Sequence, residues 1–334
     1  MDDRLRLDGA LDDLWEPLWR LSVRLLQGEK ELLRSKAVRR LHFVRHGGAS
    51  FINSHHTYSR LQHTLGVFAL TARFEPENRA LRAAALLHDT GHAPFSHLLE
   101  SIEGVDHHRW TRDVVFSEEI ANILSLSNVH PVEVMEYIDG TRRSLVRNKD
   151  GTLHADHLDS WVRSAFTGGY LDISTGELLE GIAYRNGSFE FTPEVGKHVV
   201  RLIREEARMH GSAANIGIHA MLRKLIRRLR TEGKLDVAAL PTMTDSHLEQ
   251  LLRNGESTHE EYDRLLTQSW RIRVTREQPS ESAEKETLSK LYLAIPLIKD
   301  ISTAESLDIL ATMEELKRML GTYYVRWDTE HKEL

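Results

Sequence analysis

Apolar residues recur at helical spacing along most of this chain, and this period constrains its fold more than any other feature of the sequence. Near the start, the spacing predicts an amphipathic helix over residues 11–34 from Leu11, Leu14, Leu18, Leu21, Leu25 and Leu26. Gly and Pro, which interrupt helices, supply only 20 and 8 of the 334 residues. We therefore expect an all-α fold built as a multi-helix bundle.

The same period predicts further helices, which a few other segments interrupt. We expect helices over residues 35–46, 60–71, 77–88, 110–125, 131–138, 155–166, 194–209, 212–231, 245–254 and 305–321. Asn186-Gly187 between two short apolar runs signals a type I′ turn, so one small β-hairpin is expected at about 179–192. The polar stretch 275–285 is typical of a loop, and 291–301 of a short strand or buried helix.

This pattern divides the chain into three segments. We expect an N-terminal helical extension at 1–34, a main domain at 35–255 that holds the hairpin, and a helical or mixed C-terminal region at 256–334. The absence of cysteine excludes a disulfide framework and a thiol nucleophile, and it makes the cytoplasm the expected compartment. A net charge of −6 gives no indication of nucleic-acid binding, and no apolar run approaches the ~20 residues that span a membrane.

Two histidines and two carboxylates form the candidate metal site: His63, His88, Asp89 and Asp156. Nitrogen and oxygen ligands suit a divalent ion such as Mn, Fe, Mg, Co or Zn, and such a set is appropriate for phosphate chemistry. Adjacent residues point about 100° apart on a regular helix, but Gly91 lets the chain turn so that His88 and Asp89 can face one ion. The alternative for the dipeptide alone is a histidine that is hydrogen-bonded in the core.

Three sequence motifs resemble those of the HD-domain deoxynucleotide triphosphohydrolases, and the resemblance covers roughly residues 30–255. The first is Arg60-Leu61-Gln62-His63-Thr64-Leu65-Gly66-Val67, and the second is Leu86-Leu87-His88-Asp89-Thr90-Gly91-His92-Ala93-Pro94-Phe95-Ser96-His97. The third is Ala155-Asp156-His157-Leu158-Asp159, followed by Arg163. The resemblance implies an HD-domain helical bundle, a divalent metal held by the four residues above, a nucleotide substrate and a homo-oligomer.

The resemblance also implies roles for residues around the metal. Arg60 would bind a phosphate, with His157, Arg163 and His46 as further substrate contacts, and the catalytic group would be His92, His97, Glu100 and His108. Glu100 would orient His108 as a general acid, since a carboxylate raises the pKa of an imidazole and fixes its tautomer. The alternatives are a surface role for Arg60 and Glu100, and ordinary exposed histidines at 97 and 108. The basic run Arg223 to Arg230 is either a solvated face or an anion-binding one.

Several positions depart from the family pattern in the part that contacts the substrate. Ser160 stands where a Tyr is usual, Ser164 where an Asp is usual, His157 where a Lys or Arg is common, and His46 where a Gln is expected. Residues 225–227 also replace a turn that normally supplies a Tyr. The metal-binding half of the site is therefore intact, whereas the half that contacts sugar and base is altered.

Three functions are compatible with these residues. The first is hydrolysis of a (deoxy)nucleoside triphosphate at the α-phosphorus, giving nucleoside and triphosphate. The second is hydrolysis of another nucleotide, such as a monophosphate, a second messenger or a modified nucleotide. The third is a catalytically silent module that binds nucleotide or single-stranded nucleic acid, which would be expected to lack a metal ligand or a catalytic histidine. Every one of those residues is present.

Overall fold

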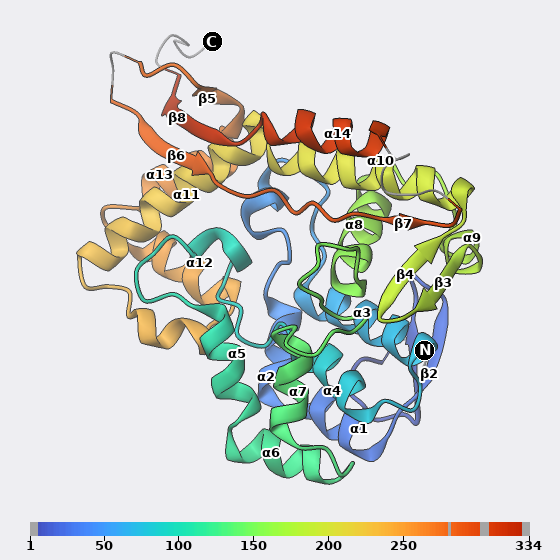
Figure 1. The fold of residues 1–334 in the computed structure, drawn as a ribbon. Coiled ribbons are helices and arrows are strands. Elements are labelled where there is room, and N and C mark those ends of the chain that lie inside the picture. The colour runs from blue at the N-terminus through green and yellow to red at the C-terminus, as the bar shows by residue number, and fades with distance from the viewer. Residues whose placement is uncertain (1–5, 280–281, 301–306, 329–334) are drawn as a thin grey trace.

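Four helices form the centre of the molecule in the computed structural model, which describes residues 6–279, 282–300 and 307–328. They are α3 (Arg60–Phe74), α4 (Arg79–Leu87), α7 (Pro131–Ile138) and α8 (Ala155–Gly168). Helix α3 packs against α4 on one side and α8 on the other, and α4 packs against α7. Figure 1 shows this group at the middle and lower right, with α10 and α14 crossing above it. Phe68, Leu86 and Trp161 belong to its core.

The remaining helices surround these four. Helices α1 (Gln27–Arg34), α2 (Lys36–Arg40), α5 (His107–Val115) and α6 (Glu118–Ser125) lie toward the bottom of Figure 1. Helices α9 (Thr175–Glu180), α10 (Pro193–His210) and α14 (Leu307–Lys317) lie toward its top and right. Short 3-10 turns occupy Leu41–Phe43, Gly48–Ile52, Ser96–Leu99, Val237–Thr242 and Ser269–Arg271.

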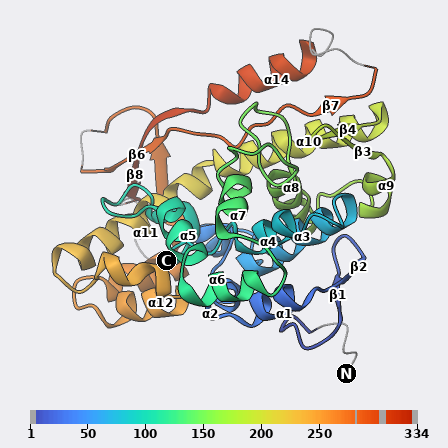
Figure 2. The same ribbon diagram turned by 60° about the horizontal axis from the view of Figure 1, so that its bottom comes forward.

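A second core forms where the long helix α11 (Ala213–Thr231) meets the C-terminal region. Helices α12 (Asp245–Asn254) and α13 (His259–Thr267) pack on α11, as does a sheet of β5 (Ile272–Thr275), β8 (Gly321–Trp327) and β6 (Glu284–Leu288) in that order. Leu222, Leu248 and Val325 are buried together there. Figure 2 shows α11, α12 and this sheet on the side away from β1 and β2.

The N-terminal segment differs from the expected helix at 11–34. It forms an antiparallel hairpin of β1 (Asp13–Glu16) and β2 (Leu21–Arg24), and only Gln27–Arg34 is helical. Pro17 lacks an amide hydrogen and disfavours a helix interior, so the leucine spacing is overridden there. Buried Leu14 and Val23 face each other across the hairpin, and Trp19 at its turn reaches the core. The described residues contain eight strands in all, so the all-α prediction is only partly supported.

The predicted hairpin near 179–192 is confirmed. Strands β3 (Ile182–Arg185) and β4 (Ser188–Phe191) pair antiparallel around Asn186-Gly187. Both turn residues have positive φ, 51° and 80°, as a type I′ turn requires. Strand β7 (Leu297–Ile298) then pairs parallel with β4, so the segment predicted as strand or helix at 291–301 contributes a short strand.

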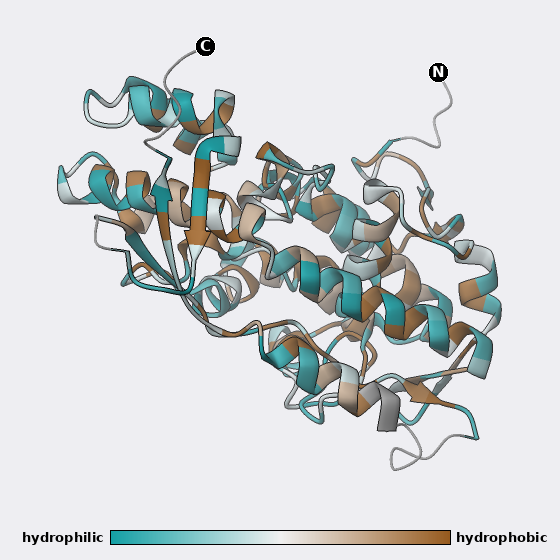
Figure 3. Ribbon diagram, turned by 90° about the horizontal axis from the view of Figure 1, so that it is seen from above, coloured by the Kyte–Doolittle hydropathy of each residue, from teal (hydrophilic) through white to brown (hydrophobic). Residues whose placement is uncertain are grey.

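The C-terminal predictions have mixed outcomes. The loop predicted at 275–285 begins as β5 ends, but β6 already starts at Glu284, and residues 280–281 lie outside the described part. The helix predicted at 305–321 appears as α14, with residues 301–306 not described, and the final residues form strand β8. Hydrophilic and hydrophobic residues alternate along the helices in Figure 3, and no helix in the described ranges is long and apolar enough to cross a membrane.

Candidate metal centre and its cavity

Three elements bring the four predicted metal ligands together. The side chain of Ser59 caps α3 and places His63 in the first turn of that helix. His88 and Asp89 follow the last residue of α4, where the chain leaves its helical path, and Asp156 lies in the first turn of α8. The fold thus gathers at one point residues that the sequence spreads over about ninety positions.

The donor atoms of His63, His88 and Asp156 are close enough to share one ion, and Asp89 lies next to them. The Nε2 atom of His63 lies 3.1 Å from Asp156 Oδ1, 3.4 Å from His88 Nε2 and 3.8 Å from Asp89 Oδ2. His88 Nε2 lies 3.5 Å from Asp89 Oδ1. Such separations between neighbouring donors match ligand bonds of about 2.0–2.2 Å to a central ion.

The other nitrogen of each histidine is held by a neighbouring acceptor. His63 donates its Nδ1 hydrogen to Asp159 Oδ2 at 2.9 Å, and His88 donates its own to the backbone oxygen of Ala85 at 2.9 Å. Asp159 in turn accepts from the indole of Trp19 at 2.7 Å and from Arg163 at 2.8 Å. Partners of this kind fix the tautomer, so that the Nε2 lone pairs point at the centre.

The electrostatics of the group favour a cation at its centre. Burial lowers the pKa of His63, but hydrogen bonds to Asp156 and Asp159 outweigh this effect and raise it to about 9. Burial raises the pKa of Asp89, yet the charges of Arg60 and His88 bring it well below its usual range. Protons and a divalent ion therefore compete for the same donors, and the donor set fits Mn, Fe, Mg, Co or Zn.

Arg60 supplies a buried donor next to this centre. Its Nε donates to Ser96 Oγ at 2.8 Å, and its Nη1 donates to Asp89 Oδ2 at 2.7 Å. The remaining nitrogen, Nη2, is buried and has no hydrogen-bond partner in the part of the chain that the structure describes. Arg60 also lines the cavity, so a fixed guanidinium with an unused donor is available to an anion beside the metal ligands.

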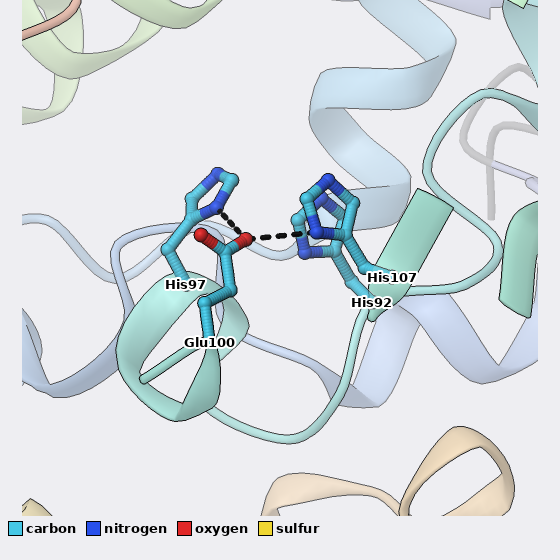
Figure 4. Close-up of side chains that lie close together, drawn as sticks. All are labelled: His92, His97, Glu100 and His107. Carbon is cyan, nitrogen blue, oxygen red and sulfur yellow. Dashed lines mark hydrogen bonds and ion pairs between the residues drawn. The ribbon is translucent and has the colours of Figure 1, made fainter. Parts of the chain in front are cut away.

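A second cluster, His92, His97, Glu100 and His107, lies beside the centre (Figure 4). His97 and His107 both donate Nδ1 hydrogens to Oε1 of Glu100, at 2.5 and 2.8 Å. The ring of His92 stacks on that of His107, with centroids 4.3 Å apart and an angle of 18°. The donor atoms of the four residues lie close enough together for an ion, but the Nδ1 atoms of His97 and His107 are already bonded to the carboxylate. We therefore interpret the cluster as two imidazoles sharing one carboxylate.

The partner of Glu100 differs from the prediction. The expected partner is His108, whereas in the structure Glu100 pairs with His97 and with His107. His108 lies beside His107, with ring centroids 3.9 Å apart, and it lines the cavity. The adjacent identical residues gave no basis for choosing between them; the choice depends on where α5 begins, at His107. Burial raises the pKa of Glu100, but the bonds from His107 and His97 lower it far below its usual range.

One cavity of about 800 Å³ joins these groups. Of the predicted residues, its lining includes His46, Arg60, His88, Asp89, His92, His97, Glu100, His108, Asp156 and His157. Arg163 does not line it, because this residue is buried between Asp159 and Glu16 and acts behind His63. The wall also contains residues that the sequence analysis did not assign: Arg147, Lys149, Glu206, His210, His219, Lys290 and Tyr292.

A strap from the C-terminal region carries two of these additional residues. This strap, residues 286–294, comprises the end of β6 and the first part of its connection to β7, and it contributes much of one wall. Glu286 at the start pairs with Arg223, and the backbone of Ile295 at the end bonds to Gly151 and Leu153. The basic run on α11 is thus largely paired with acids, since Lys224 and Arg228 both contact Glu261. Tyr292 lies inside the apolar segment 291–301 and Lys290 directly before it, and neither gave a signal that it would reach the site.

Comparison with known proteins finds one matching domain model and several relatives. Residues 60–153 match the model of the HD domain, and Asp156 follows just after the matched segment. YwfO of Bacillus subtilis (strain 168) is 30% identical over 163 residues, which is 44% of this chain and 37% of that protein. MJ1154 of Methanocaldococcus jannaschii is 25% identical over 261 residues, 70% of this chain and 54% of that protein. The chain thus spans about half the length, or less, of these relatives.

Two solved structures share the fold. A hypothetical protein from Aquifex aeolicus superposes with a TM-score of 0.71 at 18% identity, covering 95% of this chain and 96% of its own. A phosphohydrolase from Bacteroides thetaiotaomicron VPI-5482 superposes with a TM-score of 0.65 at 16% identity, covering 95% and 100%. The likeness therefore extends over nearly the whole chain, well beyond the HD domain itself.

Proposed function

We propose that this chain is a metal-dependent phosphohydrolase of nucleotides, and specifically that it converts a (deoxy)nucleoside triphosphate into nucleoside and triphosphate. One observation carries the proposal: Arg60, with a buried and unpaired Nη2, lines the same cavity as His88, Asp89 and Asp156. His63, the fourth predicted ligand, is buried next to Asp156 behind this wall. A phosphate ester is the kind of substrate that needs both a cation and a planar donor fork. The HD domain and the phosphohydrolase with the same fold support the proposal.

Each group of residues would have a separate role in the proposed reaction. A divalent ion held by His63, His88, Asp89 and Asp156 would polarise a phosphate oxygen and lower the pKa of a bound water. Arg60 would donate its free Nη2 hydrogens to the phosphate and stabilise the charge that develops there. His97 and His107 keep Nε2 for proton transfer, because Nδ1 of each is bonded to Glu100. Burial lowers the pKa of His97, and the hydrogen bond to Glu100 only partly offsets this effect. A histidine whose tautomer is fixed in this way would carry a proton to the leaving oxygen.

The wall of the cavity supports a polyphosphate rather than a single phosphate. Arg147, Lys149 and Lys290 line it, and none of them forms a salt bridge with another described residue. The ammonium of Lys290 lies 4.9 Å from the ring centroid of Tyr292, which is itself 5.4 Å from the ring of His97. Uncompensated cations near the reacting group would attract the distal phosphates.

A second candidate function is hydrolysis of a different nucleotide. The residues Ser160 and Ser164 support this alternative. Ser160 lines the cavity without the aromatic ring that the resemblance leads one to expect, and Ser164 is directed to Tyr58 and Glu206. Monophosphates, second messengers and modified nucleotides are the substrates of this alternative.

The experiment is a substrate screen with identified products. The protein is incubated with nucleoside mono-, di- and triphosphates and a divalent ion, and the products are separated as nucleoside, phosphate and triphosphate. The proposal predicts nucleoside and triphosphate from triphosphates. Release of orthophosphate alone from triphosphates would exclude attack at the α-phosphorus, and turnover of monophosphates alone would favour the second candidate.

A further inference from the structure

A buried carboxylate that the proposed chemistry does not use lies in the wall of the same cavity. Glu206 on α10 is only 2% exposed and is part of the cavity lining. Its Oε1 accepts hydrogen bonds from Ser164 Oγ at 3.3 Å and from His210 Nε2 at 3.2 Å. Its Oε2 is buried without a hydrogen-bond partner among the residues described. A buried polar atom left unpaired is costly, so this oxygen calls for a donor that the chain itself does not supply.

Hydrogen bonds around Glu206 fix the position of its Oε1 atom. The hydroxyl of Tyr58 donates to the backbone oxygen of Ser160 at 3.2 Å and lies 3.1 Å from Ser164 Oγ. The Nε2 of His56 lies 3.4 Å from the same Ser164 oxygen. The network therefore fixes the position of the carboxylate and leaves one oxygen uncommitted, an arrangement typical of a recognition site.

The charge near Glu206 is unsuited to a phosphate. Among the described residues, no lysine or arginine forms a salt bridge with Glu206. Its one salt-bridge partner there is His210. Burial lowers the pKa of the neighbouring His56 to about 4 and that of His219 to about 3, so both rings are neutral at pH 7. A carboxylate with no lysine or arginine paired to it repels anions, and the group that fits its free oxygen is an O–H or N–H donor such as a nucleoside carries.

The position of Glu206 along the cavity matches the uncharged part of a nucleotide. Its partner Ser164 is two turns beyond Asp156 on α8, which corresponds to roughly 12 Å along the helix axis. Ser160, between them, also lines the cavity. A phosphate at the metal ligands would thus leave the remainder of its molecule free to extend toward Glu206, past Ser160.

We propose that Glu206 is a specificity-determining residue that accepts a hydrogen bond from a hydroxyl or amine on the nucleoside part of the substrate. This inference rests on the proposed function, because it assumes a nucleotide bound at the metal centre. It also assigns a task to a carboxylate outside the HD domain match of residues 60–153.

The test compares Glu206→Gln with Glu205→Gln. Glu205 is the adjacent residue on α10, pairs with Arg204 and Arg208, and does not line the cavity. Binding is measured by calorimetry with slowly cleaved α-thiotriphosphates of deoxyadenosine, dideoxyadenosine and deoxythymidine. Inorganic tripolyphosphate serves as a probe that has no nucleoside. Replacing the carboxylate by an amide removes one charge-assisted hydrogen bond, for which the expected loss is about tenfold in affinity.

The inference predicts that Glu206→Gln binds deoxyadenosine α-thiotriphosphate about tenfold more weakly than wild type but binds tripolyphosphate equally well. If the substitution leaves binding of the dideoxyadenosine probe unchanged, the donor is a sugar hydroxyl. If it leaves binding of the deoxythymidine probe unchanged, the donor is the adenine amine. Unchanged binding of all nucleosides overturns the inference, as does an equal loss for tripolyphosphate, which indicates a structural role. Selective binding by a protein that hydrolyses none of these compounds would instead contradict the proposed function alone.

Discussion

At the scale of single residues, the candidate metal ligands are positioned by partners that would not contact the ion. His63 is oriented by Asp159, and Asp159 is held by Trp19 from the N-terminal hairpin and by Arg163 from the next turn of α8. These contacts explain why Arg163 is part of the family-like motif without lining the cavity. The charge of Arg163 helps to lower the pKa of Asp159 and so keeps this carboxylate ionised next to His63.

Replacing Asp159 by Asn tests this arrangement. The amide keeps the shape of the carboxylate but loses its charge, so the metal affinity should fall by about 10- to 100-fold. The measurement is competition with a chelator of known affinity. Asp172→Asn is the matched control, because Asp172 bonds a histidine in the same way, His198 at 3.0 Å, on the surface. Equal affinity in wild type and Asp159→Asn would contradict the role assigned to this carboxylate.

At the scale of elements, the site depends on how closely α3 approaches α8. Gly66 allows this approach, since a Cβ atom there would lie 1.8 Å from Asp159 Oδ1 and 2.4 Å from Arg163 Nη2. Both side chains are buried, so neither atom can move aside into solvent. The small residue in the first motif is therefore a packing requirement of the metal centre.

Gly66→Ala should separate the two helices or displace Asp159. We expect a loss of about 1–3 kcal/mol in the free energy of unfolding, together with reduced metal content. Gly176→Ala in α9 is the control, because its nearest neighbour is Ser174 Oγ at 3.8 Å, and it should be neutral or slightly stabilising. Urea unfolding and metal analysis of both variants provide the measurements. Normal metal content in a fully stable Gly66→Ala protein would refute the packing argument.

The sequence predicted most helices in which apolar residues recur at helical spacing. It missed the elements whose structure depends on contacts with distant parts of the chain. The candidate metal ligands could be named from the sequence because each stands in a compact local motif, and the fold brings them together. The hairpin at β3–β4 could be identified because Asn186-Gly187 determines its own turn. The hairpin at β1–β2 could not, since its leucines also fit a helix and its stability depends on Trp19 reaching Asp159, 140 positions away. Lys290 and Glu206 reach the cavity only through tertiary packing.

At the scale of the whole molecule, the fold buries several histidines in neutral form. Burial lowers the pKa of His56 from 6.5 to about 4, and it lowers the pKa of His219 to about 3. Between these values and 6.5 the unfolded chain binds more protons than the folded chain. The free energy of unfolding therefore increases with pH across this window and decreases on acidification.

His56→Gln should flatten that pH dependence. The variant removes one group that takes up a proton on unfolding, so the slope between pH 4.5 and 6 should fall by up to about 1.4 kcal/mol per pH unit. Urea unfolding at a series of pH values measures the slope. His259→Gln, which alters a half-exposed histidine on α13, should retain the wild-type slope. An unchanged slope in His56→Gln would show that this ring is not held neutral.

The relation between metal occupancy and phosphate-ester cleavage tests the central claim most directly. The protein is depleted with a chelator and titrated with Mn²⁺, while bound metal and release of triphosphate from deoxynucleoside triphosphates are measured in the same samples. The account predicts no activity after depletion, activity that rises in proportion to occupancy, and loss of both in Asp156→Ala. Undiminished cleavage by the depleted protein, or full occupancy without cleavage of any nucleotide, would contradict it.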